Sequence, residues 1–315
     1  MLGGNAHEPL KIGKFMLSVR YGCSFLLSAL LLDKLTIYAK FLKGSLKTML
    51  SKYLKDYCFL KVLGYGDNKY IKLVQLKNVK NAGFEDEEQE VIVTEKSQND
   101  FKLVEAISRA RSKIFELAIC NPWDYFFTGT IDSNKYDRGD LSKFHKDFTK
   151  WLQNQGRKYG SKIDFLLIPE LHSDLKSWHI HGLLCGVPDD DLRQFVIGDT
   201  MGKGIAEKVI NGDIIYNWVS YQKKFGFCDL EPIKNPVAVS KYVTKYITKN
   251  LARSVSDVGA HIYYRSRGLN SATLVSKGYY NSDFKASFQN EYVRIMEFPF
   301  DEKKLQDIQE KIVNI

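Results

Sequence analysis

The segment WHIHGLL, residues 178–184, places two histidines one residue apart. In a β-strand, side chains at positions i and i+2 point to one face, so His179 and His181 would present two imidazole groups together. Glu170 precedes them by too few residues for a parallel crossover, which predicts an antiparallel hairpin connected by residues 172–177. In that register Glu170 lies opposite His179 on the same face. Two imidazoles and a carboxylate, with positions left open, are typical of a divalent metal site that acts as a Lewis acid.

The identity of the metal stays open at this level. Two histidines at this spacing are more often ordinary surface or core residues, but a glutamate at the matching strand position, with Pro169 before it, favours a site. Zinc would suit the same ligands, and only phosphodiester chemistry favours Mg²⁺ or Mn²⁺ instead. His172 falls in the predicted turn, where we expect a solvated loop residue.

A pair of tyrosines occurs in the segment NPVAVSKYVTKYITKN, residues 235–250. Asn235 followed by Pro236 is a helix-start signature. In this helix Tyr242 and Tyr246 lie one turn apart, and a lysine follows each of them three residues later. The neighbouring stripes are apolar on one side and basic on the other: Val239, Val243 and Ile247, and Lys241, Lys245 and Lys249.

Beside a metal site, these tyrosines suit the transfer of DNA strands. A tyrosine hydroxyl can attack a phosphodiester to give a 5′-phosphotyrosine and a free 3′-OH, which conserves the bond energy for rejoining. Lys245 and Lys249 would stabilise the phosphate charge, and two tyrosines would serve two successive transfers. Without a metal, the same pattern is usually an apolar helix edge beside a solvated basic face.

The elements that must position these residues follow from the periodicity of the chain. Strands are predicted at 125–131, 163–171, 178–184, 214–221 and 225–230, and helices at 141–158, 189–196 and 237–251. Upstream, strands are predicted at 70–75 and 91–94, and a helix at 101–119. A short hairpin among alternating strands and helices predicts an α+β fold.

Composition narrows the class of protein. The 315 residues are 44% hydrophobic and 26% charged, with 7 Pro and 22 Gly, which excludes a collagen-like or wholly disordered chain. The formal net charge of +9 favours an anionic partner, most often nucleic acid. Five dispersed cysteines argue against a disulfide framework and indicate a reducing compartment. The most apolar stretch, 21–32, is too short to span a bilayer and predicts a buried or partner-facing helix.

These motifs resemble the HUH endonucleases and, within them, the rolling-circle replication initiators (Rep proteins) of phages and plasmids. WHIHGLL matches the family's histidine motif, with Glu170 of IPEL at the position of its acidic ligand. KYVTKYITK matches the tyrosine motif in its two-tyrosine form, and FFTGT, residues 126–130, matches the first motif. The resemblance covers about residues 120–251 and implies a central antiparallel sheet flanked by helices. We therefore expect an N-terminal extension or accessory region at 1–100, a nuclease domain at 101–275 and a tail with a short helix at 276–315.

The resemblance implies a site-specific nickase and strand transferase for single-stranded DNA that starts and terminates rolling-circle replication. Glu170, His179 and His181 would bind Mg²⁺ or Mn²⁺, Tyr242 and Tyr246 would be nucleophiles, and Lys245 and Lys249 would assist. No P-loop motif is present, so unwinding would need a host helicase, together with a host polymerase. We expect a cytoplasmic protein of a bacterial host cell, bound to single-stranded or hairpin origin DNA and not to a membrane. Cationic and aromatic candidates for DNA contacts are Lys241, Arg253, Tyr263, Tyr264, Arg265 and Arg267.

Three alternatives stay open. A transposase or relaxase of the same superfamily shares the chemistry, although relaxases usually carry a third histidine that this motif lacks. A non-catalytic DNA-binding regulator of replication would bind the origin without responding to EDTA. A structural zinc protein would gain stability from the metal without cleaving DNA.

Overall fold

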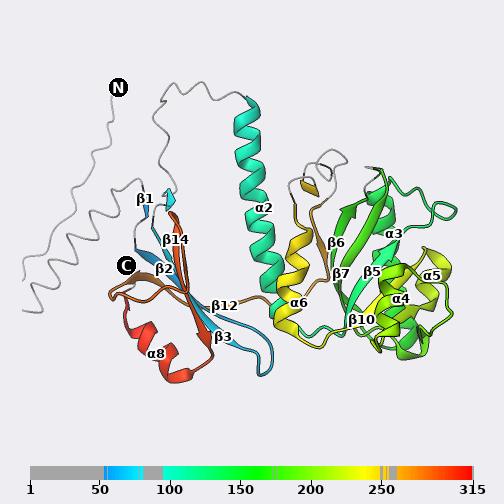
Figure 1. Cartoon of the computed structure of the whole chain (residues 1–315). Coiled ribbons are helices and arrows are strands. Elements are labelled where there is room, and N and C mark those ends of the chain that lie inside the picture. Colours follow the sequence, from blue (N-terminus) through cyan, green and yellow to red (C-terminus); the bar gives the residue numbers. More distant parts are fainter. Residues whose placement is uncertain are drawn as a thin grey trace, which may run out of the picture. The chain divides into compact units, whose positions relative to one another are not determined.

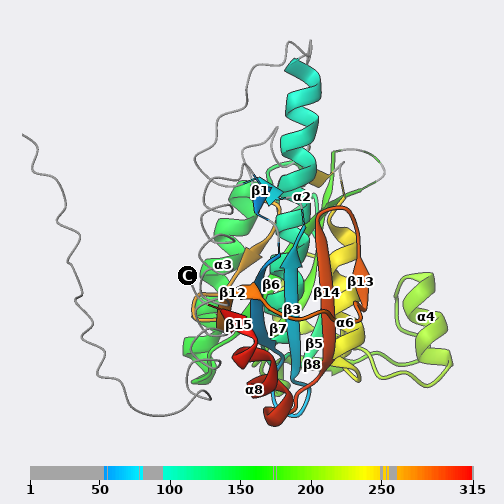
Figure 2. The same ribbon diagram turned by 90° about the vertical axis from the view of Figure 1, so that its left-hand side faces the viewer.

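Two antiparallel β-sheets with flanking helices make up the chain, an α+β fold that confirms the predicted class (Figures 1 and 2). The computed structural model describes residues 53, 54, 56–77, 79, 80, 95–172, 174, 176–248, 251, 252, 254 and 261–313. All of them belong to one unit, Lys52–Ile315. The predicted strand at 91–94 and the apolar stretch at 21–32 lie outside the described residues. In the part of the chain that the structure describes, no helix is both long enough and apolar enough to cross a membrane.

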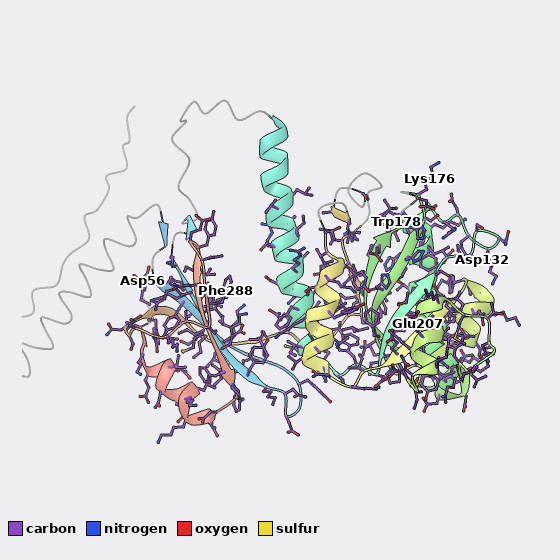
Figure 3. All side chains as sticks on the ribbon, in the orientation of Figure 1. Asp56, Asp132, Lys176, Trp178, Glu207 and Phe288 are labelled. Carbon is purple, nitrogen blue, oxygen red and sulfur yellow. The ribbon has the colours of Figure 1, made fainter. Side chains whose placement is uncertain are left out.

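The larger sheet has seven strands and carries the histidine motif. Its spatial order is β11-β6-β7-β5-β10-β9-β8. The central hairpin pairs β6 (Asp164–Leu171) with β7 (Trp178–Cys185) and places Glu170 opposite His179, which confirms the predicted register. Lys176 lies in the short connection and Trp178 begins β7 (Figure 3). The remaining strands are β5 (Tyr125–Thr130), β8 (Leu192–Gln194), β9 (Tyr216–Trp218), β10 (Cys228–Pro232) and β11 (Tyr264–Arg265).

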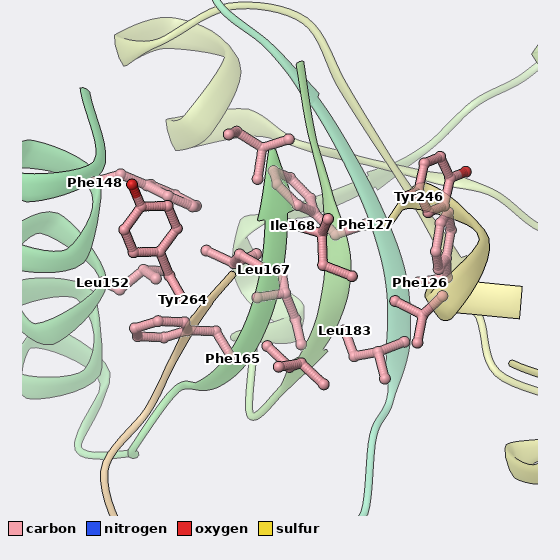
Figure 4. Close-up of a cluster of buried hydrophobic side chains, with 14 of the residues drawn as sticks. Phe126, Phe127, Phe148, Leu152, Phe165, Leu167, Ile168, Leu183, Tyr246 and Tyr264 are labelled. Atoms are coloured by element: carbon pink, nitrogen blue, oxygen red, sulfur yellow. The ribbon is translucent and has the colours of Figure 1, made fainter. Parts of the chain in front are cut away.

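One face of this sheet is covered by α3 (Leu141–Tyr159), as the periodicity of 141–158 predicts. The helix begins where the Asp140 side chain accepts a hydrogen bond from the Lys143 backbone, and it ends at Gly160, whose φ of 67° suits glycine. Phe144 and Phe148 are buried against the sheet, and burial of each such side chain contributes about 1.5–3 kcal/mol. Figure 4 shows Phe148, Leu152 and Tyr264 on one side of the strands and Phe126 and Tyr246 on the other.

The opposite face is covered by α2 (Glu95–Ile119) and α6 (Pro236–Val243), which contact each other. Helix α6 begins at the predicted Asn235-Pro236 signature, and the Asn235 side chain accepts a hydrogen bond from the Ala238 backbone. Of the predicted apolar stripe, Val243 and Ile247 are fully buried and Val239 is half-buried. The described tyrosine motif therefore packs on the sheet face that carries His179 and His181.

The prediction of one helix from 237 to 251 was wrong at its C-terminal end. The α-helix stops at Val243 and continues as the single 3₁₀ turn η2 (Thr244–Tyr246), after which Ile247 is extended. The cause is a long-range contact: Nε and Nη2 of Arg111 on α2 donate to the Ile247 backbone oxygen at 2.9 and 2.6 Å. A guanidinium on this carbonyl takes the place of the next helical hydrogen bond.

Two further predictions between β7 and β10 need correction. The helix expected at 189–196 is a 3₁₀ turn, η1 (Asp189–Asp191), followed by β8, and the strand expected at 214–221 is β9 followed by α5 (Val219–Lys224). The Asp191 carboxylate accepts hydrogen bonds from the indole of Trp218 and from the backbone N–H and side chain of Ser220. Because Asp191 binds the first turn of α5, this buried carboxylate favours a turn at both places. The strand predicted at 225–230 is shifted, since β10 begins at Cys228.

The smaller sheet joins strands from both ends of the described chain, in the order β13-β14-β3-β2-β12-β15. Its central strands β2 (Tyr57–Leu63) and β3 (Tyr70–Leu76) confirm the strand predicted at 70–75. They pair with β12 (Thr273–Tyr280) and β14 (Val293–Pro299) from the end of the chain. The other elements are β1 (Tyr53–Leu54), β4 (Val79–Lys80), α4 (Lys203–Ile210), β13 (Phe288–Gln289), α8 (Glu302–Glu310) and β15 (Ile312–Val313). The boundaries at 100 and 275 remain predictions, although regions on both sides of them share this sheet.

Candidate functional site

The centre of the site is a contact between Glu170 and His181. Oε2 of Glu170 lies 2.7 Å from Nε2 of His181, and Oγ1 of Thr128 on β5 lies 3.3 Å from Nδ1 of the same ring. Both nitrogens of His181 therefore have an oxygen partner, and these partners orient the ring. The hydrogen bond from His181 is the main reason that the pKa of Glu170 is lower than usual, and it outweighs the effect of burial. The carboxylate is thus kept ionised.

His179 lies on the same face, opposite Glu170 in the hairpin. Burial lowers its pKa first, and the charges of His172, His181 and Arg138 lower it further, so the neutral imidazole is favoured. His172, expected to be a solvated loop residue, is half exposed, but its ring centroid lies 4.9 Å from that of His179. In the described residues, no three His, Cys, Asp or Glu side chains lie close enough together to bind one metal ion. The predicted ligands share a face, while their binding of metal remains a prediction.

The tyrosine motif lies directly over this face. The ring of Tyr246 stacks on His181 with centroids 4.1 Å apart and planes 13° apart. Phe126 of β5 supports both tyrosines, with centroids 6.3 Å from Tyr246 and 5.3 Å from Tyr242. Phe126 and Thr128 alternate on one face of the strand FFTGT, for which sequence reasoning expected only general support. The structure thus brings residues of all three motifs together.

The two tyrosines have different environments. Tyr242 is 44% exposed, whereas Tyr246 is 9% exposed. The hydroxyl of Tyr246 donates to the hydroxyl of Tyr242 at 3.2 Å, and Lys245 places its ammonium 3.5 Å from the centroid of the Tyr242 ring. Burial raises the pKa of Tyr242, but hydrogen bonds from Lys245 and Tyr246, with the charges of Lys245 and Lys208, bring it below the ordinary value. Burial and the hydrogen bond to Tyr242 raise the pKa of Tyr246.

Sequence reasoning missed two carboxyl groups on this face. Asp229 and Glu231 alternate on β10, where they lie opposite Thr128 and Phe126. Burial raises the pKa of Asp229 to about 7, helped by the charge of Glu231. Glu231 forms an ion pair with Lys208 of α4, whose ammonium lies 2.7 Å from both carboxylate oxygens. The i, i+2 spacing in the segment CDLEP was a signal that could have identified them, as it identified the histidines.

The predicted DNA-contact residues are placed differently from one another. Lys241 is exposed on α6, and Arg265 and Arg267 are exposed at β11 and just after it. Arg265 lies opposite Leu166 and so shares the sheet face of Glu170. Tyr263 is half-buried, and Tyr264 is buried on the α3 side with its ring centroid 3.5 Å from that of His145, so it is not open to a base. Lys249 and Arg253 lie outside the described residues.

Residues 124–251 match the model of a protein family described as replication-associated protein ORF2. This segment runs from just before β5 to just beyond η2, so it includes the first motif, the histidine strand and the tyrosine helix. The match covers less than half of the chain and supports a role in the initiation of DNA replication, as in Rep-type proteins. No curated protein and no solved structure matches the chain.

Proposed function

We propose that this protein is a metal-dependent nickase and strand transferase for single-stranded DNA that initiates and terminates rolling-circle replication. The observation that carries the proposal is the stacking of Tyr246 on His181 at 4.1 Å, because it brings the tyrosine pair to the sheet position where Glu170 contacts His181. The family match over residues 124–251 supports the role in replication, and the net charge of +9 suits a DNA partner.

Tyr242 is the proposed nucleophile of the first cleavage. Its hydroxyl is the more exposed of the two, and it accepts hydrogen bonds that lower its pKa. The phenolic oxygen attacks the scissile phosphorus and loses its proton, while the bond from phosphorus to the 3′ oxygen breaks and that oxygen is protonated. The products are a 5′-phosphotyrosine and a free 3′-OH, which a polymerase can extend. Lys245, beside the Tyr242 ring, stabilises the charge of the phosphate.

Glu170, His179 and His181 are the proposed metal ligands. Their donor atoms suit a divalent ion, since the Glu170 carboxylate is ionised and the His179 imidazole is kept neutral, which are the protonation states that metal ligands need. When bound, Mg²⁺ or Mn²⁺ would supply a positive charge that polarises the phosphate oxygens. Thr128 orients His181 through the other ring nitrogen.

Tyr246 is the proposed second nucleophile, which acts when one round of replication is complete. In the described structure it is the buried donor of the hydroxyl pair, so it needs Tyr242 to be engaged before its own hydroxyl is released. Two nucleophiles one turn apart allow one strand to be held while the regenerated origin is cut. Lys241, Arg265 and Arg267 are exposed cations that can contact the DNA backbone, and Lys249, Arg253 and Tyr263 remain candidates for this role. Tyr264, which is buried, is the weakest of them.

The test is the formation of a covalent adduct. The protein is incubated with single-stranded DNA that carries candidate origin hairpins of its own replicon, with Mn²⁺ or with EDTA, and the products are separated on denaturing gels. We expect an adduct with Mn²⁺ that EDTA abolishes, and that is lost when both Tyr242 and Tyr246 are changed to Phe. Tyr263→Phe, which keeps a half-buried aromatic ring outside the tyrosine pair, is the matched control.

Two results would contradict the proposal. Tight origin binding without any adduct, unaffected by EDTA, would indicate a non-catalytic regulator of replication. A metal-dependent gain in thermal stability without cleavage or origin binding would indicate a structural metal protein. Host helicase and polymerase remain proposed partners, to be tested by reconstitution after an adduct has been obtained.

A further inference from the structure

A cavity of about 390 Å³ borders Tyr242 where β10 leads into α6. Two aromatic rings, Phe126 and Tyr242, form one wall, with centroids 5.3 Å apart. Polar groups surround the rest: Lys208, Glu231, Lys234 and Asn235. The volume lies in the range of sites that enclose a small organic ligand. The described structure thus has a polar, aromatic-walled cavity beside the proposed first nucleophile.

We infer that this cavity binds one nucleobase of the DNA strand next to the scissile phosphate, and so contributes to the choice of cleavage site. The inference rests on the proposed function, because it takes Tyr242 to be the residue that attacks the phosphate. A strand that brings its phosphate to the Tyr242 hydroxyl must place a neighbouring nucleotide close to the same side chain. Aromatic rings accept the face of any base, while the polar groups distinguish the edges of bases.

Glu231 supplies the main acceptor. Its carboxylate is ion-paired with Lys208 through both oxygens, but a carboxylate accepts about four hydrogen bonds, so acceptor positions remain. Carboxylates in DNA-binding sites accept from the amino groups of bases, as from N4 of cytosine. Thymine has no amino group and leaves this acceptor unpaired, which is unfavourable in a partly enclosed site.

Asn235 and the lysines supply donors. The Asn235 side-chain oxygen already accepts from the Ala238 backbone at 2.9 Å, which leaves its amide N–H groups to donate. Lys208 is held by Glu231, while Lys234 is ion-paired only with exposed Asp213 at 3.0 Å and is free to reorient. Donors beside an acceptor suit a base that carries an amino group next to a carbonyl, which describes guanine and cytosine.

The test measures base preference around the cleavage point. The point is first mapped from the free 3′ end that the wild-type protein releases from its origin strand with Mn²⁺. Each flanking position is then randomised singly, and the captured adducts are sequenced. We expect one adjacent position at which guanine or cytosine is preferred over thymine by about tenfold, the size of one good base contact. In Glu231→Gln this preference falls to about twofold at that position alone.

A second variant separates recognition from folding. Asn235→Ser keeps a good N-cap for α6 but removes the amide donors, so it should alter the same position while the preferences elsewhere persist. Glu207→Gln, an exposed carboxylate of α4 that does not line the cavity, is the matched control and should keep the wild-type preference. Adducts with an unchanged preference in both cavity variants would overturn the inference and leave the nickase intact. No adduct with the wild-type protein would overturn the proposed function and the inference with it.

Discussion

The hydroxyl of Tyr246 donates a hydrogen bond to the hydroxyl of Tyr242 at 3.2 Å. This direction makes the two residues unequal, since the acceptor is the exposed Tyr242 and the donor is buried over His181. A hydrogen bond donated to a phenolic oxygen stabilises the phenolate form, so Tyr246 helps to prepare Tyr242 for attack. The pair therefore forms an ordered arrangement in which one tyrosine is set to react before the other.

The order of the tyrosines can be tested with single substitutions. Tyr242→Phe should lower the rate of the first cleavage by about a thousandfold or more, as loss of a nucleophile does. Tyr246→Phe should lower it by about tenfold or less, because only one hydrogen bond to the nucleophile is lost. Single-turnover adduct formation on gels measures both rates. Equal losses in the two variants would contradict an ordered pair.

Lys245 should control the ionisation of Tyr242. It hydrogen-bonds the Tyr242 hydroxyl and places a positive charge beside it, which favours the phenolate and helps bring the pKa below its ordinary value. In Lys245→Gln we expect this pKa to rise, so tyrosinate absorbance and the alkaline increase in cleavage rate should both appear at higher pH. Lys241→Gln, one position before Tyr242 on α6, is the control and should leave the titration unchanged. An unshifted titration in Lys245→Gln would contradict the assigned role.

Asp229 should make the folded protein less stable as the pH rises. Burial raises its pKa from 3.8 to about 7, so the folded state binds the proton more tightly than the unfolded state does. The stabilisation is complete below pH 3.8 and is lost as the pH increases to about 7. Asp229→Asn should remove this dependence and raise the free energy of unfolding at pH 8 by roughly 1–3 kcal/mol.

Urea denaturation at pH 5 and pH 8 measures the effect of Asp229. The difference between the two pH values should be smaller in Asp229→Asn than in the wild-type protein. Asp213→Asn is the control, because Asp213 is exposed and lies in a surface ion pair with Lys234. A parallel loss of stability at both pH values would mean that Asn disrupts packing at this position and that the carboxyl is not protonated there.

Arg111 should position Tyr246 more than Tyr242. Its guanidinium binds the Ile247 backbone oxygen at 2.9 and 2.6 Å, directly after the turn that carries Tyr246. Arg111→Gln should therefore reduce cleavage by Tyr246, measured in a Tyr242→Phe background, about tenfold more than cleavage by Tyr242, measured in a Tyr246→Phe background. Ser112→Ala, an exposed neighbour on α2, should affect neither. A uniform reduction in both backgrounds would indicate a general effect on folding.

Sequence alone determined the local geometry of the candidate site. The short connection between Glu170 and His179 permits only a hairpin, and the two-residue period of a strand then specifies which side chains share a face. The start of α6 was equally local, because the Asn235 cap and Pro236 act within one turn. Such features depend on residues near one another in the chain, so reading the sequence was sufficient.

Only the tertiary structure decided how α6 ends and how the tyrosines differ. Arg111 and Ile247 are 136 positions apart, and Tyr246 is buried because His181 and Phe126 of two separate strands lie beneath it. The same holds for the pairing of β2 and β3 with β12 and β14 at the far end of the chain. Periodicity reports which face of an element is apolar, but not which distant element covers that face. The unequal environments of Tyr242 and Tyr246 follow from contacts that form only when these distant segments meet.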